Sequence, residues 1–172
     1  MTGWRVEVNA PLKDKMVICV APHTSNWDFI IGLFAYRSLG RKANFLMKDF
    51  WFFFPLKYLL NYLGGIPVPR KKKSGSLTSQ IIEMFQKRKY LNLAVTPEGT
   101  RKATESWHYG FLYIAKDAKV PVLLAAIDYK NKKVLLDKEI NFVENLPSTM
   151  NKIKFYYSRF KENALYPEKF IS

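Results

Sequence analysis

The chain has 172 residues, 48% of them hydrophobic and 24% charged, so it can bury the core of one compact domain and is not disordered by composition. Lysine and arginine exceed aspartate and glutamate by 28 − 14 = 14 charges, which indicates an anionic partner: nucleic acid, acidic lipid, a phosphorylated substrate or an acidic carrier protein. One cysteine and two histidines exclude an internal disulfide framework and argue against a metal cluster built from these residues.

Short apolar runs alternate along the chain with segments of helical pattern. In chain order the predicted elements are a strand at Lys15–Ala21, a helix at Asn26–Leu39, a strand at Asn44–Met47, a helix at Phe50–Leu63, a strand at Ile66–Val68, a helix at Leu77–Arg88, a strand at Leu91–Val95, a helix at Gly110–Ala118, and strands at Val120–Ile127, Lys132–Leu136 and Lys152–Phe160. This alternation predicts an α/β fold, a single domain with a largely parallel central sheet flanked by helices.

Targeting and membrane-spanning segments are not predicted. The first residues lack the apolar core of a signal peptide. The most apolar stretch, Phe50–Leu63, is broken by Pro55, Lys57 and Asn61 and falls short of the roughly 18 residues that a spanning helix needs. We therefore expect an intracellular protein that meets a membrane, if at all, at its surface.

The sequence His23-Thr-Ser-Asn-Trp-Asp28 follows the first predicted strand and opens the first predicted helix. A neutral histidine can take a proton from an alcohol, and a carboxylate on its other ring nitrogen orients the ring and stabilises the imidazolium. The two side chains can meet only if His23 precedes the helix and Asp28 lies in its first turns. The alternative is a loop histidine beside an aspartate that interacts favourably with the helix dipole.

Two further segments follow predicted strands or helices. Thr96-Pro-Glu-Gly-Thr-Arg101 offers a glycine that permits a tight turn and an arginine whose planar donors suit phosphate oxygens. Its alternative is an ordinary turn with a solvated arginine. Gly64-Gly-Ile-Pro-Val-Pro-Arg70, with Lys48 upstream, offers a second anion contact or, alternatively, a helix stop followed by a basic surface loop.

Together these segments resemble the glycerophospholipid acyltransferase family, which contains the lysophosphatidic-acid acyltransferases. The family's histidine–four residues–aspartate block matches His23 to Asp28, and its Glu-Gly-Thr-Arg block matches Glu98 to Arg101. A further block and the residues that precede it match Lys48, Pro55, Gly65, Ile66 and Arg70, and a Val-Pro block matches Val120-Pro121-Val122. The blocks occur in the family's order between about Lys15 and Asp128. Thr96 departs from the family, which usually has an aromatic residue before Pro-Glu-Gly.

The resemblance implies a single acyltransferase domain over residues 1–172, with acyl-CoA or acyl carrier protein as donor and a hydroxyl of a (lyso)glycerophosphate lipid as acceptor. It implies that His23 and Asp28 are catalytic, as general base and orienting carboxylate, without an acyl-enzyme. It further implies no cofactor and no metal, and it places Val120–Val122 near the acyl path. The residues implied to bind the acceptor are Glu98, Gly99, Thr100, Arg101, Arg70 and Lys48.

Seven aromatic residues crowd the segment from Phe50 to Tyr62, which Lys48 and Lys57 flank. Aromatic rings favour the membrane–water interface and lysines attract anionic lipid, so we expect a peripheral protein on the cytoplasmic face, bound to an anionic membrane surface. The alternative for this segment is a buried core helix. The alternative for the whole chain is a basic nucleic-acid-binding domain, which explains the charge but not the His23 and Glu98 motifs; no nucleic-acid partner is expected.

Overall fold

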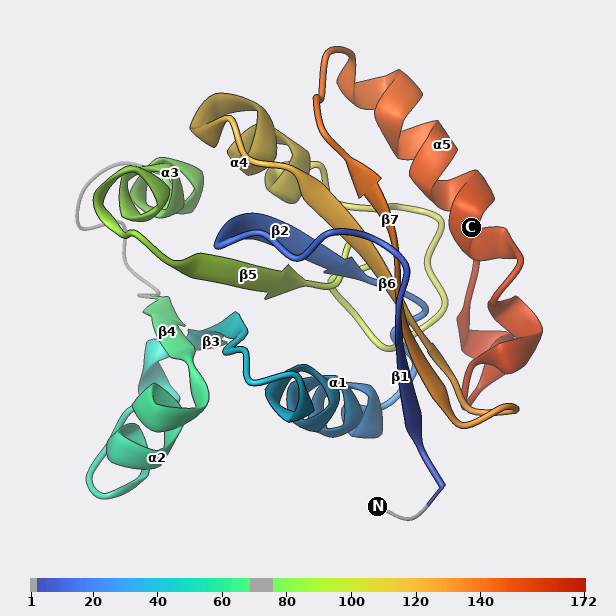
Figure 1. The fold of residues 1–172 in the computed structure, drawn as a ribbon, viewed down its shortest axis with the longest axis horizontal. Coiled ribbons are helices and arrows are strands. Elements are labelled where there is room, and N and C mark those ends of the chain that lie inside the picture. Colours follow the sequence, from blue (N-terminus) through green and yellow to red (C-terminus); the bar gives the residue numbers. More distant parts are fainter. Residues whose placement is uncertain (1–2, 69–75) are drawn as a thin grey trace.

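A computed structural model of the chain describes residues 3–68 and 76–172 (Figure 1). The strands are β1 (Arg5–Val8), β2 (Lys15–Val20), β3 (Asn44–Lys48), β4 (Gly65–Val68), β5 (Leu91–Val95), β6 (Val122–Asp128) and β7 (Lys133–Ile140). The helices are α1 (Asn26–Ser38), α2 (Leu56–Leu63), α3 (Leu77–Lys87), α4 (Gly110–Ala118) and α5 (Leu146–Ser158), with short 3₁₀ turns η1 (Asp49–Trp51), η2 (Lys161–Asn163) and η3 (Pro167–Lys169).

The described strands form one seven-stranded sheet in the order β1-β7-β6-β2-β5-β3-β4. The five strands from β6 to β4 are mutually parallel, whereas β7 runs antiparallel to β6 and β1 pairs in parallel with β7. The predicted α/β class and largely parallel sheet are therefore confirmed. In the register of the central strands Cys19 lies opposite Val95, so the loops that follow β2 and β5 leave the same edge side by side.

Alternating side chains of the strands point to two different layers. On one face Val17 and Cys19 join a continuous core with residues of α3, α4 and α5. On the other face Met16 and Ile18 pack with residues of α1, the helix that covers this side in the described part of the chain. Figure 1 shows α1 on the opposite side of the sheet from α3 and α4.

The strand predicted at Lys152–Phe160 is wrong, because most of this segment lies in the helix α5, which ends at Ser158. The alternation of Ile153, Phe155 and Tyr157 favoured a strand, but Phe155 is 82% exposed. The buried positions are Ile153, Tyr156, Tyr157 and Phe160, a spacing that places them on one helical face. Asn145 caps this helix by accepting a hydrogen bond from the Ser148 backbone N–H (2.9 Å). The strand β1 was not predicted.

The aromatic segment between residues 50 and 62 is not a core helix. It contains the turn η1 and the helix α2, which begins directly after Pro55. Only Leu60 of α2 is buried, whereas the rings of Phe50, Trp51, Phe53, Phe54, Tyr58 and Tyr62 are exposed, and we call these six residues the aromatic surface. In the part of the chain that the structure describes, no helix has the length and apolar character to cross a membrane.

Candidate active site

The loop between β2 and α1 brings His23 and Asp28 together. Ser25 is the N-cap of α1: its hydroxyl accepts a hydrogen bond from the Trp27 N–H (3.2 Å), and its own N–H donates to Asp28 Oδ2 (2.8 Å). This reciprocal pair is a capping box, so the pattern Ser25-x-x-Asp28 fixes the helix start and the aspartate in one motif. His23 thus precedes the helix and Asp28 lies in its first turn, as the sequence predicts.

Asp28 is almost completely buried, and every contact of its carboxylate is polar. Oδ2 accepts the backbone N–H of Thr24 (2.7 Å) as well as that of Ser25, and Oδ1 accepts the hydroxyl of Tyr129 (2.6 Å). Donors at a helix N-terminus stabilise a buried negative charge, as does the positive end of the helix dipole. The carboxylate is therefore held in one orientation by three donors before His23 is counted.

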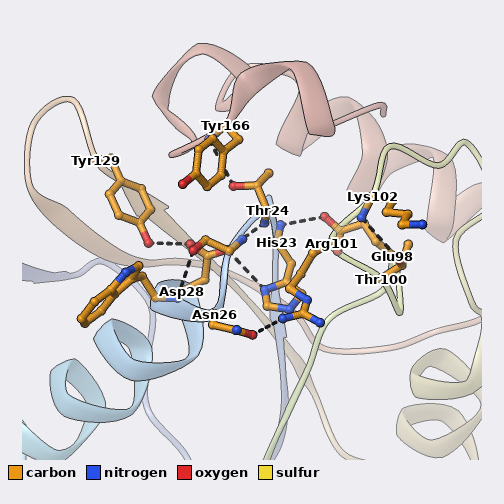
Figure 2. A network of polar contacts seen from close by, with 12 residues as sticks. His23, Thr24, Asn26, Asp28, Glu98, Thr100, Arg101, Lys102, Tyr129 and Tyr166 are labelled. Carbon is orange, nitrogen blue, oxygen red and sulfur yellow. Dashed lines mark hydrogen bonds and ion pairs between the residues drawn. The ribbon is translucent and has the colours of Figure 1, made fainter.

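The ring of His23 lies against this carboxylate. Its Nδ1 is buried 3.3 Å from Asp28 Oδ2, within ion-pair distance but without the alignment of a linear hydrogen bond. The side chain as a whole is 17% exposed, so the ring is not sealed off from the cavity that it lines. Figure 2 shows His23 at the centre of the polar network, between Asp28 and the loop that follows β5.

The loop that follows β5 contributes Glu98, whose side chain is buried next to His23. Its Oε1 accepts the backbone N–H of His23 (2.9 Å), and its Oε2 is buried without a hydrogen-bond partner. Burial, reinforced by the charge of Asp28, raises the pKa of the Glu98 carboxyl to about 7, against the lowering effect of its backbone hydrogen bonds and of His23. The carboxyl therefore fixes the histidine backbone, a role that the sequence motif does not specify.

Gly99 is a glycine for two reasons. Its φ of +61° lies in the left-handed region, and a Cβ at this position would come within 2.5 Å of Cδ2 of His108. The loop is closed by the His108 N–H, which donates to the Pro97 carbonyl (2.8 Å). Thr100, the residue after Gly99, accepts a hydrogen bond from the Lys102 N–H through its Oγ1 (3.2 Å). His108, a residue without an assigned role in the sequence, thus packs on the motif.

Three cationic residues were predicted to bind the acceptor, and the structure brings one of them to the dyad. Arg101 donates a hydrogen bond to Asn26 Oδ1 at the start of α1, and both residues line the same cavity as His23 and Asp28 (Figure 2). Lys48 is exposed at the end of β3, on the same edge of the sheet. Arg70 lies outside the described residues.

A cavity of about 760 Å³ begins at the dyad and extends between α1 and the sheet. Its polar end is lined by His23, Asn26, Asp28, Thr96 and Arg101. Further along, its walls are apolar and come from α1 and from β2, β3, β5, β6 and β7; they include Val20, Phe29, Leu33, Tyr36, Phe45, Ala94, Ala125, Ile127 and Leu136. This is the size and lining of a small-molecule site with an apolar ligand portion.

The expectation that Val120–Val122 lies near the acyl path is not supported by this cavity. Val122 is opposite Val17, and the Val17 N–H donates to the Pro121 carbonyl (3.0 Å), at the end of β6 remote from His23. The residues of β6 that line the cavity are Ala125, Ala126 and Ile127. The difference arises because the sequence motif marks where β6 begins, whereas the site lies where the strand ends.

The candidate site thus combines an apolar cavity with a histidine–carboxylate pair at its polar end. The sequence model of the acyltransferase family matches residues 5–128, which is 124 of 172 residues. The chain therefore belongs to the acyltransferase family, the glycerophospholipid acyltransferases, and is a transferase of acyl groups. No curated protein and no solved structure gave a match, and no finding supports the nucleic-acid-binding alternative.

Proposed function

We propose that this protein transfers a fatty acyl group from acyl-CoA or acyl carrier protein to a hydroxyl of a (lyso)glycerophosphate lipid. The observation that carries the proposal is the position of the His23–Asp28 pair at the polar end of an apolar cavity. The pair supplies a base for the hydroxyl, and the cavity accommodates an apolar chain next to it. The family match supports acyl transfer in general.

In the proposed reaction His23 acts as the general base. With Nδ1 against Asp28, the other ring nitrogen, Nε2, accepts the hydroxyl proton while the acceptor oxygen attacks the thioester carbonyl. The new C–O bond forms, the C–S bond breaks, and the imidazolium returns its proton to the departing thiolate. Asp28 stabilises the imidazolium by its charge. No acyl-enzyme and no metal are required, since the thioester is already activated.

The cavity beneath α1 suits the acyl chain of the donor. It follows α1 from Asn26 to Tyr36, ten steps along the helix that correspond to about 15 Å. Its volume of about 760 Å³ lies within the usual range of ligand pockets. A chain bound here would place its thioester end at the dyad.

The acceptor is proposed to carry a phosphate held by Arg101, with Lys48 and Arg70 as further cations. Arg101 is exposed, lines the cavity, and its guanidinium is anchored to Asn26 beside the dyad. A planar guanidinium fits phosphate oxygens in pairs.

Acyl transfer from radiolabelled acyl-CoA and acyl carrier protein to a panel of lysophospholipid and glycerophosphate acceptors tests the activity. His23→Ala should reduce turnover by roughly 10²–10⁴-fold without unfolding the protein, because general-base catalysis contributes that much. Asp28→Asn should cost less, since the imidazole remains. Asp117→Asn, at an exposed position of α4, is the matched control. A His23→Ala enzyme that kept more than about a tenth of the wild-type rate would falsify the assigned role.

The same proposal includes peripheral binding to an anionic membrane. The aromatic surface is exposed, and Lys57 lies over the Tyr58 ring at 5.1 Å, so cations and apolar rings alternate on this surface. Arg37 of α1 joins it by donating to the Tyr62 carbonyl (2.8 Å). The net charge of +14 complements anionic headgroups, at about 1 kcal/mol per basic residue near the surface.

Sedimentation with phosphatidylcholine vesicles, with and without phosphatidylserine, tests the membrane proposal. Binding to the anionic vesicles should weaken as salt rises but not vanish, because ring insertion is not screened. Trp51→Ser with Phe53→Ser should remove the salt-resistant part and leave the melting temperature unchanged, since both rings are exposed. Phe142→Ser with Phe155→Ser, two rings that are more exposed and lie outside this surface, is the control. Persistent high-salt binding of a folded Trp51/Phe53 variant would exclude the aromatic surface as the anchor.

A further inference from the structure

Tyr129 contacts the catalytic pair from outside both sequence motifs. It directly follows β6, and its hydroxyl donates to Asp28 Oδ1 at 2.6 Å (Figure 2). That distance is typical of a charge-assisted O–H···O⁻ bond. The backbone donors and His23 all contact Oδ2, so Tyr129 supplies the contact to the other carboxylate oxygen.

Tyr129 is itself fixed from two directions. Its backbone N–H donates to the Asn163 carbonyl at the end of η2 (2.9 Å), and its ring meets the ring of Trp4 edge-on, with centroids 5.4 Å apart. Burial raises the pKa of the Tyr129 hydroxyl, and the charge of Asp28 raises it further, so the hydroxyl remains a donor at neutral pH. The ring therefore has little freedom to leave the carboxylate.

The C-terminal part of the chain also reaches the opposite side of the dyad loop. The Tyr166 N–H donates to Oγ1 of the buried Thr24 (3.3 Å), and Thr24 in turn gives its N–H to Asp28. Asn163 and Tyr166 thus hold two residues that both contact the same carboxylate. Tyr129, Asn163 and Tyr166 all lie after residues 5–128, the segment that the family model matches.

We propose that Tyr129 is a positioning residue that acts through Asp28, and that Asn163 and Tyr166 hold Tyr129 and Thr24, respectively, against this carboxylate. Its hydroxyl keeps the carboxylate plane turned so that Oδ2 faces both the helix N–H groups and His23. The catalytic consequence rests on the proposed function of the dyad, whereas the positioning itself is a property of the folded protein and is measurable without substrate.

Tyr129→Phe is the decisive variant, because it removes the hydroxyl but keeps the ring against Trp4 and the backbone bond to Asn163. We expect a roughly tenfold lower kcat with unchanged KM for donor and acceptor, as for the loss of one hydrogen bond to a charged group. In an Asp28→Asn background the same change should cost less than twofold, because the route through the carboxylate is already lost. Tyr113→Phe, on an exposed ring of α4, is the matched control.

A substrate-free measurement separates this proposal from the activity. The chain has two histidines, so ring-proton NMR can follow His23 and His108 individually. The ionisable groups around His23 are Asp28, Glu98, Arg101 and Tyr129, and only the last changes. In Tyr129→Phe the pH at which His23 protonates should rise, because the carboxylate loses a donor that shares its charge; His108 should not move. Asp28→Asn should abolish this response.

Unchanged His23 titration in a folded Tyr129→Phe protein overturns the positioning role, whether or not acyl transfer is observed. Rate losses that add fully to those of Asp28→Asn, or a loss confined to KM or to melting temperature, overturn it as well, since they indicate a merely structural tyrosine. If His23 titrates as expected but His23→Ala leaves turnover intact, the proposed function fails and the positioning contact stands.

Discussion

Three helices cover one face of the sheet, whereas α1 covers the other in the described part of the chain. Under α3, α4 and α5 the core contains large, fully buried side chains such as Phe85, Leu112 and Tyr157. Under α1 the buried residues form clusters with fewer members, and a cavity of about 760 Å³ lies between part of the helix and the strands. Close packing stabilises a fold, and space between elements allows it to bind a ligand. In this protein one face of the sheet is closely packed, whereas the other face leaves space in which a ligand could fit.

The same leucine-to-alanine substitution on each face of the sheet tests whether the two faces are packed differently. Leu112→Ala on the packed face should lower the free energy of unfolding by up to about 5 kcal/mol, because the removed atoms leave a cavity. Leu33→Ala on α1 should cost only about 2 kcal/mol, since this side chain already borders empty space. Urea denaturation measures both. Equal costs would mean that α1 is packed as tightly as α4.

A second test concerns Glu98, whose carboxyl is buried at the edge where the packed face reaches the dyad. Its pKa is about 7 in the folded protein, above its ordinary value of 4.5. The stability it contributes is therefore fully present below pH 4.5 and is lost as pH rises through 7, when the folded state must hold a buried charge. The loss amounts to about 3 kcal/mol.

Glu98→Gln should remove that pH dependence, while its amide oxygen still accepts the His23 N–H. The difference in unfolding free energy between variant and wild type, measured from pH 4 to pH 8, should grow in favour of glutamine as pH rises. A difference that stays constant over this range would show that Glu98 does not titrate there.

Arg101→Ala tests the mouth of the cavity, where the expected effect is on binding and not on folding. Because Arg101 is exposed, its removal should change stability by no more than about 0.5 kcal/mol. The apparent KM for the acceptor should rise about tenfold, and that for the donor should not, since one charge-assisted contact is lost. Lys102→Ala, at the next exposed position, is the control. An acceptor without an anionic group used equally well by the wild type would contradict the assignment.

The sequence predicts well those features that depend on residues close together in the chain. The β2–α1 loop holds His23, the capping serine and Asp28 within six residues, so a contact between the two side chains could be expected from their spacing, whereas their catalytic role is implied only by the family resemblance. The parallel order of β2 and β5 then requires the Glu98 loop to be its neighbour. Gly110–Ala118 was predicted to the residue, because its helical pattern has clear ends.

What the sequence does not reveal depends on contacts between distant segments. Tyr129 is 101 residues from Asp28, and nothing local distinguishes it from other tyrosines in the chain. The alternation in α5 was ambiguous because only tertiary packing exposes Phe155 and buries Tyr156. Likewise, the aromatic segment at 50–62 has the composition of a core helix, and only its placement on the outer side of β4 leaves its rings exposed.

The sharpest test of the cavity is Gly32→Leu, whose main effect should be on substrate choice and not on stability. Gly32 lies on α1 and lines the cavity; a Cβ there would meet only Ile127 Cδ1, at an ordinary contact distance of 3.9 Å. A leucine can therefore extend into empty space, and replacing glycine inside a helix is favourable by up to about 1 kcal/mol. Stability should stay the same or rise slightly.

The preference for acyl chain length should change instead. If the chain of the donor lies beneath α1, a leucine at position 32 shortens the space available, so turnover with the longest acyl-CoA substrates should fall while that with the shortest is retained. Gly110→Leu, at the start of α4 where a Cβ meets no atom within 4 Å, is the matched control and should leave the profile unchanged. A folded Gly32→Leu enzyme with the wild-type chain-length profile would place the acyl chain elsewhere. The cavity beneath α1 would then require another explanation, because filling it would have changed neither stability nor substrate choice.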